Sequence, residues 1–422
     1  MRFSPALLNH AETLLAELLS SSLPADAVVS YYFRQNPKLG HADRGFIAES
    51  VYGVLRRKRS LAARCGGEQF AMQQRLLRVY LACVQGLNLR ELAPVLSEAD
   101  HVWMAQAKAL RLNTLPAVVR LDLPDWLYEA LREAFGEDEL EPLAASLNVA
   151  APLDLRVNPL KARREEVLAR LVSDGMVASA CTYSPLGIRL TGKPSLARHP
   201  LFLDGSFEVQ DEGSQLLGFL VQPKRGEMVA DFCAGAGGKT LLLGALMRSQ
   251  GRLYAFDVVE KRLAKLKPRL ARSGLSNVHP ARIDSENDVK IKRLAGKLDR
   301  VLVDAPCSGL GTLRRNPDLK WRQTPESIAE LTAKQTAILA AAATLLRPGG
   351  RLVYATCSML PAENAAIVSG FLAAHPEFVA LSAVDVLQKQ GITVDGDAAG
   401  CLQLLPHRHG TDGFFAAVME RR

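Results

Sequence analysis

The chain has 422 residues, of which 48% are hydrophobic and 23% charged, a composition typical of globular proteins. Because a single hydrophobic core stops growing below this length, we expect two or three domains. No apolar run is long enough to cross a membrane, and Glu12 and Glu17 interrupt the apolar N-terminal stretch, so we expect neither a transmembrane helix nor a signal peptide. The net charge of +8 is compatible with a polyanionic partner.

The seven cysteines are scattered, odd in number and without a CxxC pair. This pattern is unlike a disulfide framework or a zinc site, and it is typical of proteins in the reducing cytoplasm. We therefore expect a cytoplasmic protein without a metal. The cysteines are Cys65, Cys83, Cys181, Cys233, Cys307, Cys357 and Cys401.

Residues 1–145 are predicted to be helical, because apolar residues recur there at spacings of three and four. Residues 41–60 (HADRGFIAESVYGVLRRKRS) predict one helix with Ile47, Val51 and Leu55 on one face. The basic cluster at its end fits a solvated helix terminus, which the helix dipole favours, and an RNA contact equally well. This cluster is Arg56, Arg57, Lys58 and Arg59.

Residues 146–222 mix strand and helix patterns. Strands are indicated by LDLRVNP and GIRLTG, and a helix by ARREEVLARLVSDG. A strand that enters a helix is predicted by GSFEVQDEGSQLLGFLVQ. We expect a small α+β module here.

From residue 223 onwards, short runs rich in β-branched and aromatic residues alternate with helical patterns. Strands are predicted for MVADFCA, RLYAFDV, DRVLVDAP and GRLVYATCS. Helices are predicted for TLLLGALMRS, EKRLAKLKPRLARSG and SIAELTAKQTAILAAAATLL. This alternation indicates an α/β domain with a parallel, doubly wound sheet, which binds ligands beyond the carboxyl ends of its strands.

A glycine-rich turn, DFCAGAGGKT, joins the first of these strands to the first helix. Glycines at such a turn let a ligand approach the backbone. Cys233 stands where a P-loop needs glycine, and Thr240 stands at the third glycine of a dinucleotide fingerprint, so the first motif fails and the second matches in part. Asp257 ends the next strand, where an acid can accept the hydroxyls of an adenosine ribose in NAD and S-adenosylmethionine proteins alike.

Cys307 and Cys357 follow the strands DRVLVD and GRLVYA, so we expect both at the carboxyl edge of one sheet. A thiolate there can add to carbon-6 of cytosine, which makes carbon-5 an enamine carbon able to take a sulfonium methyl group. A second polar group can assist when carbon-5 loses its proton and the cysteine leaves. Asp304 stands nearby and can bind the cytosine amino edge. The remaining cysteines outside the glycine turn are interpreted as small buried hydrophobic residues.

At these residues the sequence resembles the RsmB/Sun-type RNA cytosine-5 methyltransferases. The matching stretches are VQDEGSQLL, DFCAGAGGKT, DAPCSGLGTLRRNPDLKW and LVYATCSMLPAEN, within residues 205–365. LDLRVNPLKARREEVLARL resembles the RNA-recognition module of that family, and ADRGFIAESVYGVLRRKRSL is similar to its NusB-like domain. The resemblance implies an all-α NusB-like RNA-binding domain over residues 1–145, the small α+β module over 146–222 and a Rossmann-like class I methyltransferase domain over 223–422.

The resemblance also implies S-adenosylmethionine as the cofactor and RNA, foremost ribosomal RNA, as the partner. It gives Cys357 the attack on the base and Cys307 a part in product release. Asp257 would hold the ribose, Asp284 would lie near the adenine, and Asp304 would lie near the methionine and the target base. The cofactor loop would comprise Cys233, Ala234, Gly235, Ala236, Gly237, Gly238 and Lys239.

Basic residues are concentrated in the C-terminal half, where residues 251–300 carry 13 Lys and Arg against 6 Asp and Glu. Arg314, Arg315 and Lys320 stand beside the Cys307 turn and are expected to contact phosphates, which position a target base. A basic face on the helix predicted over 260–274 is interpreted as solvated rather than as an RNA contact. Its residues are Lys261, Lys265, Arg269 and Arg272.

Three alternatives stay open. A transfer RNA cytosine-5 methyltransferase would use the same chemistry. An RNA-binding ribosome assembly factor with a vestigial methyltransferase domain would not need the intact cysteines and acids. A nicotinamide-dependent oxidoreductase would explain the glycine loop and Asp257, but not the two strand-end cysteines.

Overall fold

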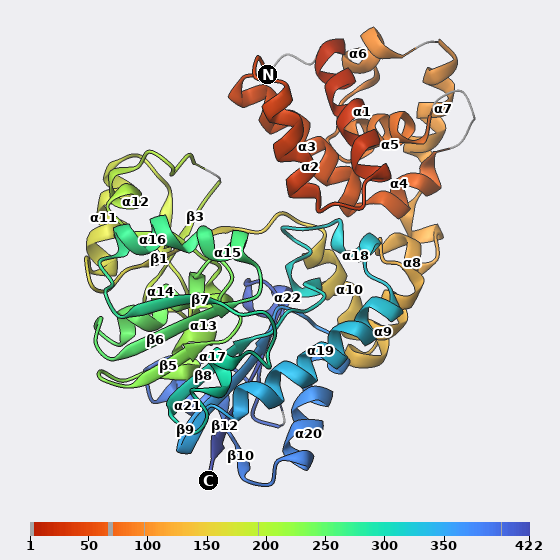
Figure 1. Cartoon of the computed structure of the whole chain (residues 1–422). Coiled ribbons are helices and arrows are strands. Elements are labelled where there is room, and N and C mark those ends of the chain that lie inside the picture. Colours follow the sequence, from red (N-terminus) through yellow and green to blue (C-terminus); the bar gives the residue numbers. More distant parts are fainter. Residues whose placement is uncertain (1–3, 66–70, 97, 193, 398) are drawn as a thin grey trace. The chain divides into compact units, whose positions relative to one another are not determined.

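The computed structural model describes residues 4–65, 71–96, 98–192, 194–397 and 399–422. By its internal packing the chain divides into two units, traced from red to blue in Figure 1. The helical unit comprises residues 1–150 together with 312–324. The α/β unit comprises residues 151–311 together with 325–422.

The helical unit has one core, formed where apolar residues spaced by three and four along several helices meet. Leu14, Ile47 and Leu77 are completely buried in it. The prediction of an all-helical N-terminal region is confirmed for the described residues. The helices are α1 (Pro5–Ser20), α2 (Ala25–Gln35), α3 (His41–Arg56), α4 (Lys58–Arg64), α5 (Met72–Cys83), α6 (Leu89–Leu92), α7 (Glu98–Ala109), α8 (Ala117–Arg120), α9 (Asp125–Phe135) and α10 (Glu137–Leu147), with 3-10 turns at Ala93–Val95 and Leu112–Thr114.

The helix predicted over residues 41–60 is interrupted at Arg57, where α3 ends and α4 begins. The Arg56 guanidinium is buried and donates a hydrogen bond to the carbonyl oxygen of Arg314 at 3.0 Å. Arg59 donates to the carbonyl oxygen of Leu123 at 2.7 Å and pairs with Asp125. The interpretation of this cluster as an RNA contact is therefore wrong for Arg56, which packs inside the unit.

Residues 312–324 pack with the helical unit, although they follow the Cys307 turn in the sequence. They contain α18 (Leu319–Arg322), whose Lys320 ammonium is buried and donates to the carbonyl oxygen of Arg56 at 2.8 Å and to Asn148 Oδ1 at 3.0 Å. This burial lowers the pKa of Lys320 to about 7. Arg314 is buried as well. The prediction that Arg314 and Lys320 contact phosphates is therefore wrong, because both side chains are taken up by packing.

The α/β unit begins with a small antiparallel sheet in the strand order β2-β3-β1-β4. Leu155, Val167 and Phe207 are completely or almost completely buried between this sheet and its helices. The elements are β1 (Leu153–Val157), α11 (Arg164–Ser173), β2 (Ala178–Ala180), β3 (Gly187–Leu190), α12 (Pro200–Leu203) and β4 (Phe207–Val209). The chain then enters α13 (Glu212–Val221), which packs on the larger sheet.

The larger sheet has the strand order β10-β12-β9-β8-β5-β6-β7, with β11 paired to β12. From β7 to β9 neighbouring strands are parallel, as predicted, but β12 runs antiparallel to β9, β10 and β11, so the sheet is mixed. The strands are β5 (Met228–Asp231), β6 (Arg252–Asp257), β7 (Val278–Arg282), β8 (Leu298–Asp304), β9 (Leu346–Thr356), β10 (Phe378–Leu381), β11 (Leu402–Leu404) and β12 (Phe414–Arg421).

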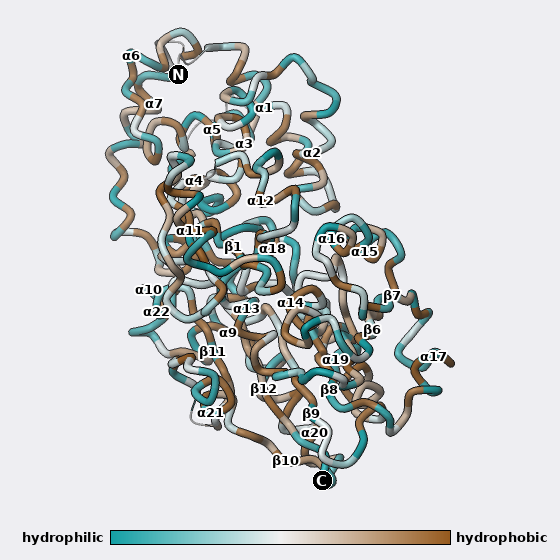
Figure 2. The backbone as a smooth tube through the Cα atoms, turned by 90° about the vertical axis from the view of Figure 1, so that its left-hand side faces the viewer, coloured by the Kyte–Doolittle hydropathy of each residue, from teal (hydrophilic) through white to brown (hydrophobic). Residues whose placement is uncertain are grey.

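Helices cover both faces of this sheet, with one apolar core on each side. The strands appear in Figure 2 as mainly hydrophobic segments, as expected for a sheet buried on both faces. One face carries α13, α14 (Gly238–Leu246), α15 (Glu260–Ala264), α16 (Leu266–Ser273) and α21 (Ala383–Gln388), and the other carries α17 (Val289–Lys292), α19 (Pro325–Ala343) and α20 (Ala365–Ala374). Further short helical turns are Leu310–Thr312, Pro361–Glu363 and α22 (Pro406–His409). Within the described ranges, no helix has both the length and the apolar character needed to cross a bilayer.

Candidate active site

The carboxyl ends of β5, β6, β8 and β9 lie at one edge of the larger sheet, because these strands are mutually parallel neighbours. The strand order reverses at β5, so β6 lies on one side of it and β8 on the other. Ligands of open α/β sheets bind at such a reversal. The structure thus brings to one edge the glycine turn, Asp257, Asp304 and the two strand-end cysteines.

The cofactor loop predicted from Cys233 to Lys239 connects β5 to α14 as a tight turn. Gly235 and Gly237 have φ values of +56° and +80°, which favour glycine, and a Cβ at Gly237 would lie 2.2 Å from Leu266 Cδ1. The Ala234 N–H donates to the carbonyl oxygen of Phe256 at 2.8 Å, which fixes the loop to β6. The glycines therefore allow a backbone conformation that would be strained with any other residue.

Asp257 is buried at the end of β6, and its carboxylate holds the cofactor loop through a hydrogen bond. One oxygen accepts the Gly235 N–H and the other accepts the Val259 N–H, each at 2.8 Å. Each carboxylate oxygen has a second lone pair, so both can still accept ribose hydroxyls. Asp284 lies just beyond β7 with an exposed side chain that pairs with Arg282 at 2.9 Å. It therefore stands at the same edge as Asp257, but on the surface.

Lys239 and Asp304 form an ion pair, with 2.7 Å between Nζ and Oδ2. Lys239 lies in the predicted cofactor loop, and this ion pair connects the loop to the end of β8. The charge of Asp304 and the hydrogen bond between them raise the pKa of Lys239 despite its burial. The pair presents an ammonium donor next to a carboxylate acceptor, and the Asp304 side chain is 30% exposed.

The Sγ atoms of Cys307 and Cys357 lie 3.4 Å apart, although the residues are 50 positions apart in the sequence. Both cysteines are free and half-buried. The hydrogen bond to Cys357 and burial raise the pKa of Cys307 well above its ordinary value. Two adjacent thiols do not ionise together, because the charge of the first thiolate holds the proton on the second. The pair can therefore supply one thiolate and one thiol.

Arginine side chains connect the small sheet with the cofactor loop and with α16, and sequence reasoning missed these contacts. Arg156 of β1 is buried and donates to the carbonyl oxygen of Gly238 at 2.5 Å. Arg269 donates to the carbonyl oxygen of Ala236 at 2.7 Å, and it pairs with Glu208. Arg272 pairs with Glu208 too, at 2.6 Å. The interpretation of Arg269 and Arg272 as a solvated face is therefore wrong, since both pair with Glu208 of β4 and Arg269 also holds the cofactor loop.

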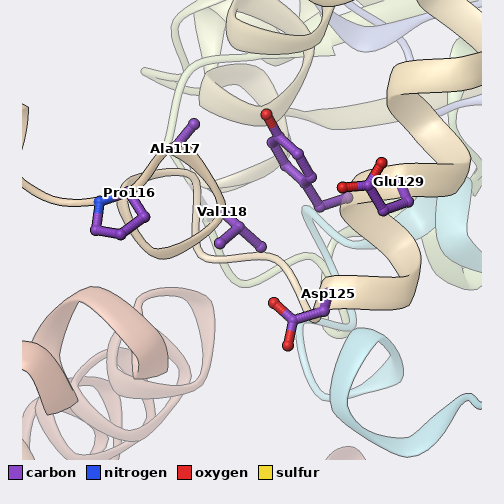
Figure 3. Close-up of a pocket in the computed structure, with 6 residues that line it drawn as sticks. Pro116, Ala117, Val118, Asp125 and Glu129 are labelled. Carbon is purple, nitrogen blue, oxygen red and sulfur yellow. The ribbon is translucent and has the colours of Figure 1, made fainter.

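Two other features are weaker site candidates. A pocket of about 240 Å³ in the helical unit is lined by residues at α8 and α9 (Figure 3). Its acids Asp125 and Glu129 pair with arginines. Asp154, Cys181 and Glu212 have their ligand atoms within 4.8 Å of one another, as a metal site would. Arg189 occupies that cluster, however, at 2.7 Å from Asp154 and 3.6 Å from Glu212. Neither feature offers the chemistry of the sheet edge.

The strand order, the glycine loop and the acid that ends β6 define a Rossmann-like domain, and the comparison with known families makes it a methyltransferase domain. A family model described as 16S rRNA methyltransferase RsmB/F matches residues 218–420. A second model, the ferredoxin-like domain of RsmF/B-like methyltransferases, matches residues 123–197 and thus begins just before α9. The probable ribosomal RNA small subunit methyltransferase B of Synechocystis is 36% identical over 94% of this chain and 95% of its own length. The chain therefore belongs to the RsmB/F methyltransferase family.

The chain is also similar to a further relative and to two solved structures. The ribosomal RNA small subunit methyltransferase B of Pseudomonas syringae pv. tomato is 36% identical over 72% of this chain and 66% of its own. The crystal structure of PH0851 is similar over 100% of both chains, with a TM-score of 0.80 and 27% identity. A methyltransferase homolog protein from Pyrococcus horikoshii is similar over 74% of this chain and 100% of its own, with a TM-score of 0.63 and 30% identity.

Proposed function

We propose that the protein methylates carbon-5 of a cytosine in ribosomal RNA, with S-adenosylmethionine as the methyl donor. The observation that carries this proposal is the pair of sulfur atoms 3.4 Å apart at the carboxyl edge of the sheet. A methyltransferase acting on an oxygen or an amino nitrogen needs no sulfur nucleophile, whereas carbon-5 of cytosine needs one to become reactive. The ribosomal substrate rests on the names of the relatives and on the resemblance to NusB-domain members.

Cys357 is assigned the attack. Its thiolate adds to carbon-6, and the electron pair of the carbon-5–carbon-6 double bond becomes available at carbon-5 as an enamine. When bound, S-adenosylmethionine supplies the electrophilic methyl group that carbon-5 takes. The thiol at Cys307 can donate a hydrogen bond to the Cys357 thiolate before attack, because its raised pKa keeps its proton in place.

Release then needs a base for the proton on carbon-5, and Cys307 is assigned that part. In the adduct, Cys357 is a thioether and no longer carries the charge that holds the proton on Cys307. Cys307 can then lose its proton to solvent and accept the proton from carbon-5. The electrons of that carbon–hydrogen bond restore the double bond as the carbon-6–sulfur bond breaks, and Cys357 leaves as a thiolate.

Asp304 and Lys239 are assigned to the base edge. Cytosine presents an amino donor beside ring nitrogen and carbonyl acceptors, which matches a carboxylate beside an ammonium. Asp304 would accept from the amino group and Lys239 would donate to an acceptor of the ring. The target base would have to leave its stack to reach this edge, with residues 1–145 and the module over 146–222 holding the surrounding RNA.

The residues of the glycine turn fit S-adenosylmethionine. The positive φ values at Gly235 and Gly237 favour glycine, and the missing side chains leave the loop backbone open to a ligand. Asp257 can accept the two ribose hydroxyls. Cys233, Ala234, Ala236, Gly238 and Lys239 complete the loop, with Asp304 beside it. Asp284 stays assigned to the adenine end, from its place beyond β7.

The proposal is tested by incubating the protein with tritiated S-adenosylmethionine and unmodified 16S ribosomal RNA transcribed in vitro. Label is expected in the RNA, and digestion is expected to release it as 5-methylcytidine. Equal labelling of transfer RNA transcripts would support the transfer RNA alternative. Binding of RNA without labelling would support the assembly factor, and stabilisation by a nicotinamide cofactor alone would support the oxidoreductase.

Replacing Asp257 with alanine should weaken S-adenosylmethionine binding roughly tenfold or more, because charge-assisted hydrogen bonds of this kind contribute about 1.5–3 kcal/mol. The loss also frees the Gly235 N–H, so the loop itself becomes less ordered. Isothermal titration calorimetry measures the affinity. Asp385→Ala, which removes an exposed carboxylate from α21, is the control. Unchanged affinity in Asp257→Ala would contradict the ribose assignment.

A further inference from the structure

A buried carboxylate lies between the two cysteine turns. Glu363, at the end of the 3-10 turn Pro361–Glu363, has no exposed surface. One of its oxygens accepts the Ser308 N–H at 2.8 Å and the Gln335 side-chain N–H at 3.0 Å. The other accepts the hydroxyl groups of Ser308, at 2.5 Å, and of Ser358. Both serines directly follow a cysteine of the pair.

The hydrogen bonds of Glu363 lie just beyond the point where the pairing of β8 with β9 ends. The ladder between β8 and β9 extends to Asp304 and Ala355, and one more bond joins the Ala305 N–H to the carbonyl oxygen of Ala355. Beyond it, the next backbone bond between the two segments joins the Gly311 N–H to the carbonyl oxygen of Cys357 at 2.9 Å. The Glu363 carboxylate joins the two turns there, and the serine hydroxyls lie 3.2 Å from each other.

The donors that reach Glu363 in these contacts are uncharged, so its burial is compensated by hydrogen bonds rather than by a cation. Burying a carboxylate in this way is costly, and an apolar side chain would fill the same space at less expense. A side chain that only filled the core would not need a carboxylate that accepts hydrogen bonds from both turns. The arrangement is explained if the distance between the two cysteine turns has to be kept for the reaction.

We propose that Glu363 is a positioning residue that sets the distance between Cys307 and Cys357 through Ser308 and Ser358. This inference rests on the proposed function, because it assigns the two tethers to the two halves of that reaction. Ser358 holds the cysteine that forms the adduct, and Ser308 holds the cysteine that resolves it. Displacing a reacting group by about 1 Å can cost roughly a hundredfold in rate, so a tether of this kind has a measurable effect.

The test separates attack from release with two RNA substrates. One is ordinary RNA, and the other is transcribed with 5-fluorocytidine triphosphate in place of the cytidine triphosphate. Fluorine on carbon-5 cannot leave as a proton does, so on that RNA the adduct accumulates at the rate of attack and methyl transfer. On ordinary RNA the lifetime of the adduct reports release. Denaturing gels and tritium counting measure the formation and the lifetime of the adduct. Calorimetry measures the affinity for the cofactor, and melting curves measure the stability of each variant.

Ser358→Ala should slow adduct formation on the fluorinated RNA roughly tenfold, because the attacking cysteine loses one tether. Ser308→Ala should leave that rate nearly unchanged and lengthen the adduct lifetime on ordinary RNA by a similar factor. Glu363→Gln, which keeps the shape but replaces an acceptor with a donor, should slow both steps. Ser382→Ala, which removes the cap of α21, and Glu227→Gln, which weakens the pair with Arg300, are the matched controls for lost stability.

Equal slowing of both steps by the two serine variants would overturn the inference, as would losses of activity that merely follow the melting temperature. Cys357→Ala is run beside them to keep the two proposals apart. If wild-type protein formed no adduct on the fluorinated RNA, the proposed function would fail and the positioning role would fall with it. If Cys357→Ala formed one, the assignment of the two cysteines would be wrong, and with it the assignment of the two tethers. If both behave as expected, the serine variants decide the role of Glu363 alone.

Discussion

Cys357→Ala is expected to abolish methyl transfer to ribosomal RNA and to prevent any covalent protein–RNA species. Without the sulfur, carbon-5 of the target cytosine never becomes an enamine, so we expect a loss on the order of a thousandfold or more, as when other catalytic nucleophiles are removed. Affinity for S-adenosylmethionine should stay within a few-fold of wild type, since the loop and Asp257 are unchanged. Filter-binding of tritiated RNA and calorimetry measure the two quantities.

Cys401→Ala is the matched control, because it removes a half-buried thiol from the same α/β unit away from the strand-end pair. It should retain most of the methyl transfer. If Cys357→Ala kept activity comparable to this control, both strand-end cysteines would be packing residues and the proposed chemistry would be wrong.

Cys307→Ala is expected to have the opposite phenotype. Attack and methyl transfer proceed, but the proton on carbon-5 has lost its base, so a protein–RNA species that survives denaturing gels should accumulate. It should require S-adenosylmethionine, because the methyl group must be in place before release becomes the blocked step. Turnover should fall on the order of a hundredfold or more, the usual contribution of a positioned general base.

The wild-type protein, run in parallel, should show little of this species with ordinary RNA. An adduct in Cys357→Ala and none in Cys307→Ala would exchange the two assignments. That result would leave the fold and the family unchanged, because they rest on the sheet topology and the relatives.

The strand-end positions of Asp257, Asp304, Cys307 and Cys357 could be predicted, because strand patterns are short and local and parallel strands share one carboxyl edge. The roles of buried polar residues could not. Glu363 stands in a sequence that reads as a surface turn, Leu-Pro-Ala-Glu-Asn, and only the folded chain brings the two serine turns to its carboxylate.

The burial of Arg314 and Lys320 could not be predicted from the sequence either. Basic residues are mostly exposed, so a basic run beside a reactive turn is naturally interpreted as a phosphate contact. The Lys320 ammonium reaches partners 172 and 264 positions away, Asn148 and Arg56, and Arg56 in turn donates to the Arg314 carbonyl oxygen. No local pattern specifies these contacts. The antiparallel β12 was missed for a related reason, since a short apolar run does not reveal its direction or its partner strand.

The central claim is that Cys357 forms the bond to the base, and mapping the adduct tests it most directly. Wild-type protein is incubated with S-adenosylmethionine and 5-fluorocytosine-containing 16S ribosomal RNA, digested with nuclease and protease, and analysed by mass spectrometry. We predict a methylated fluorocytidine fragment attached to the peptide that carries Cys357. Attachment to the Cys307 peptide, or the absence of any attached nucleotide while ordinary RNA is still methylated, would contradict it.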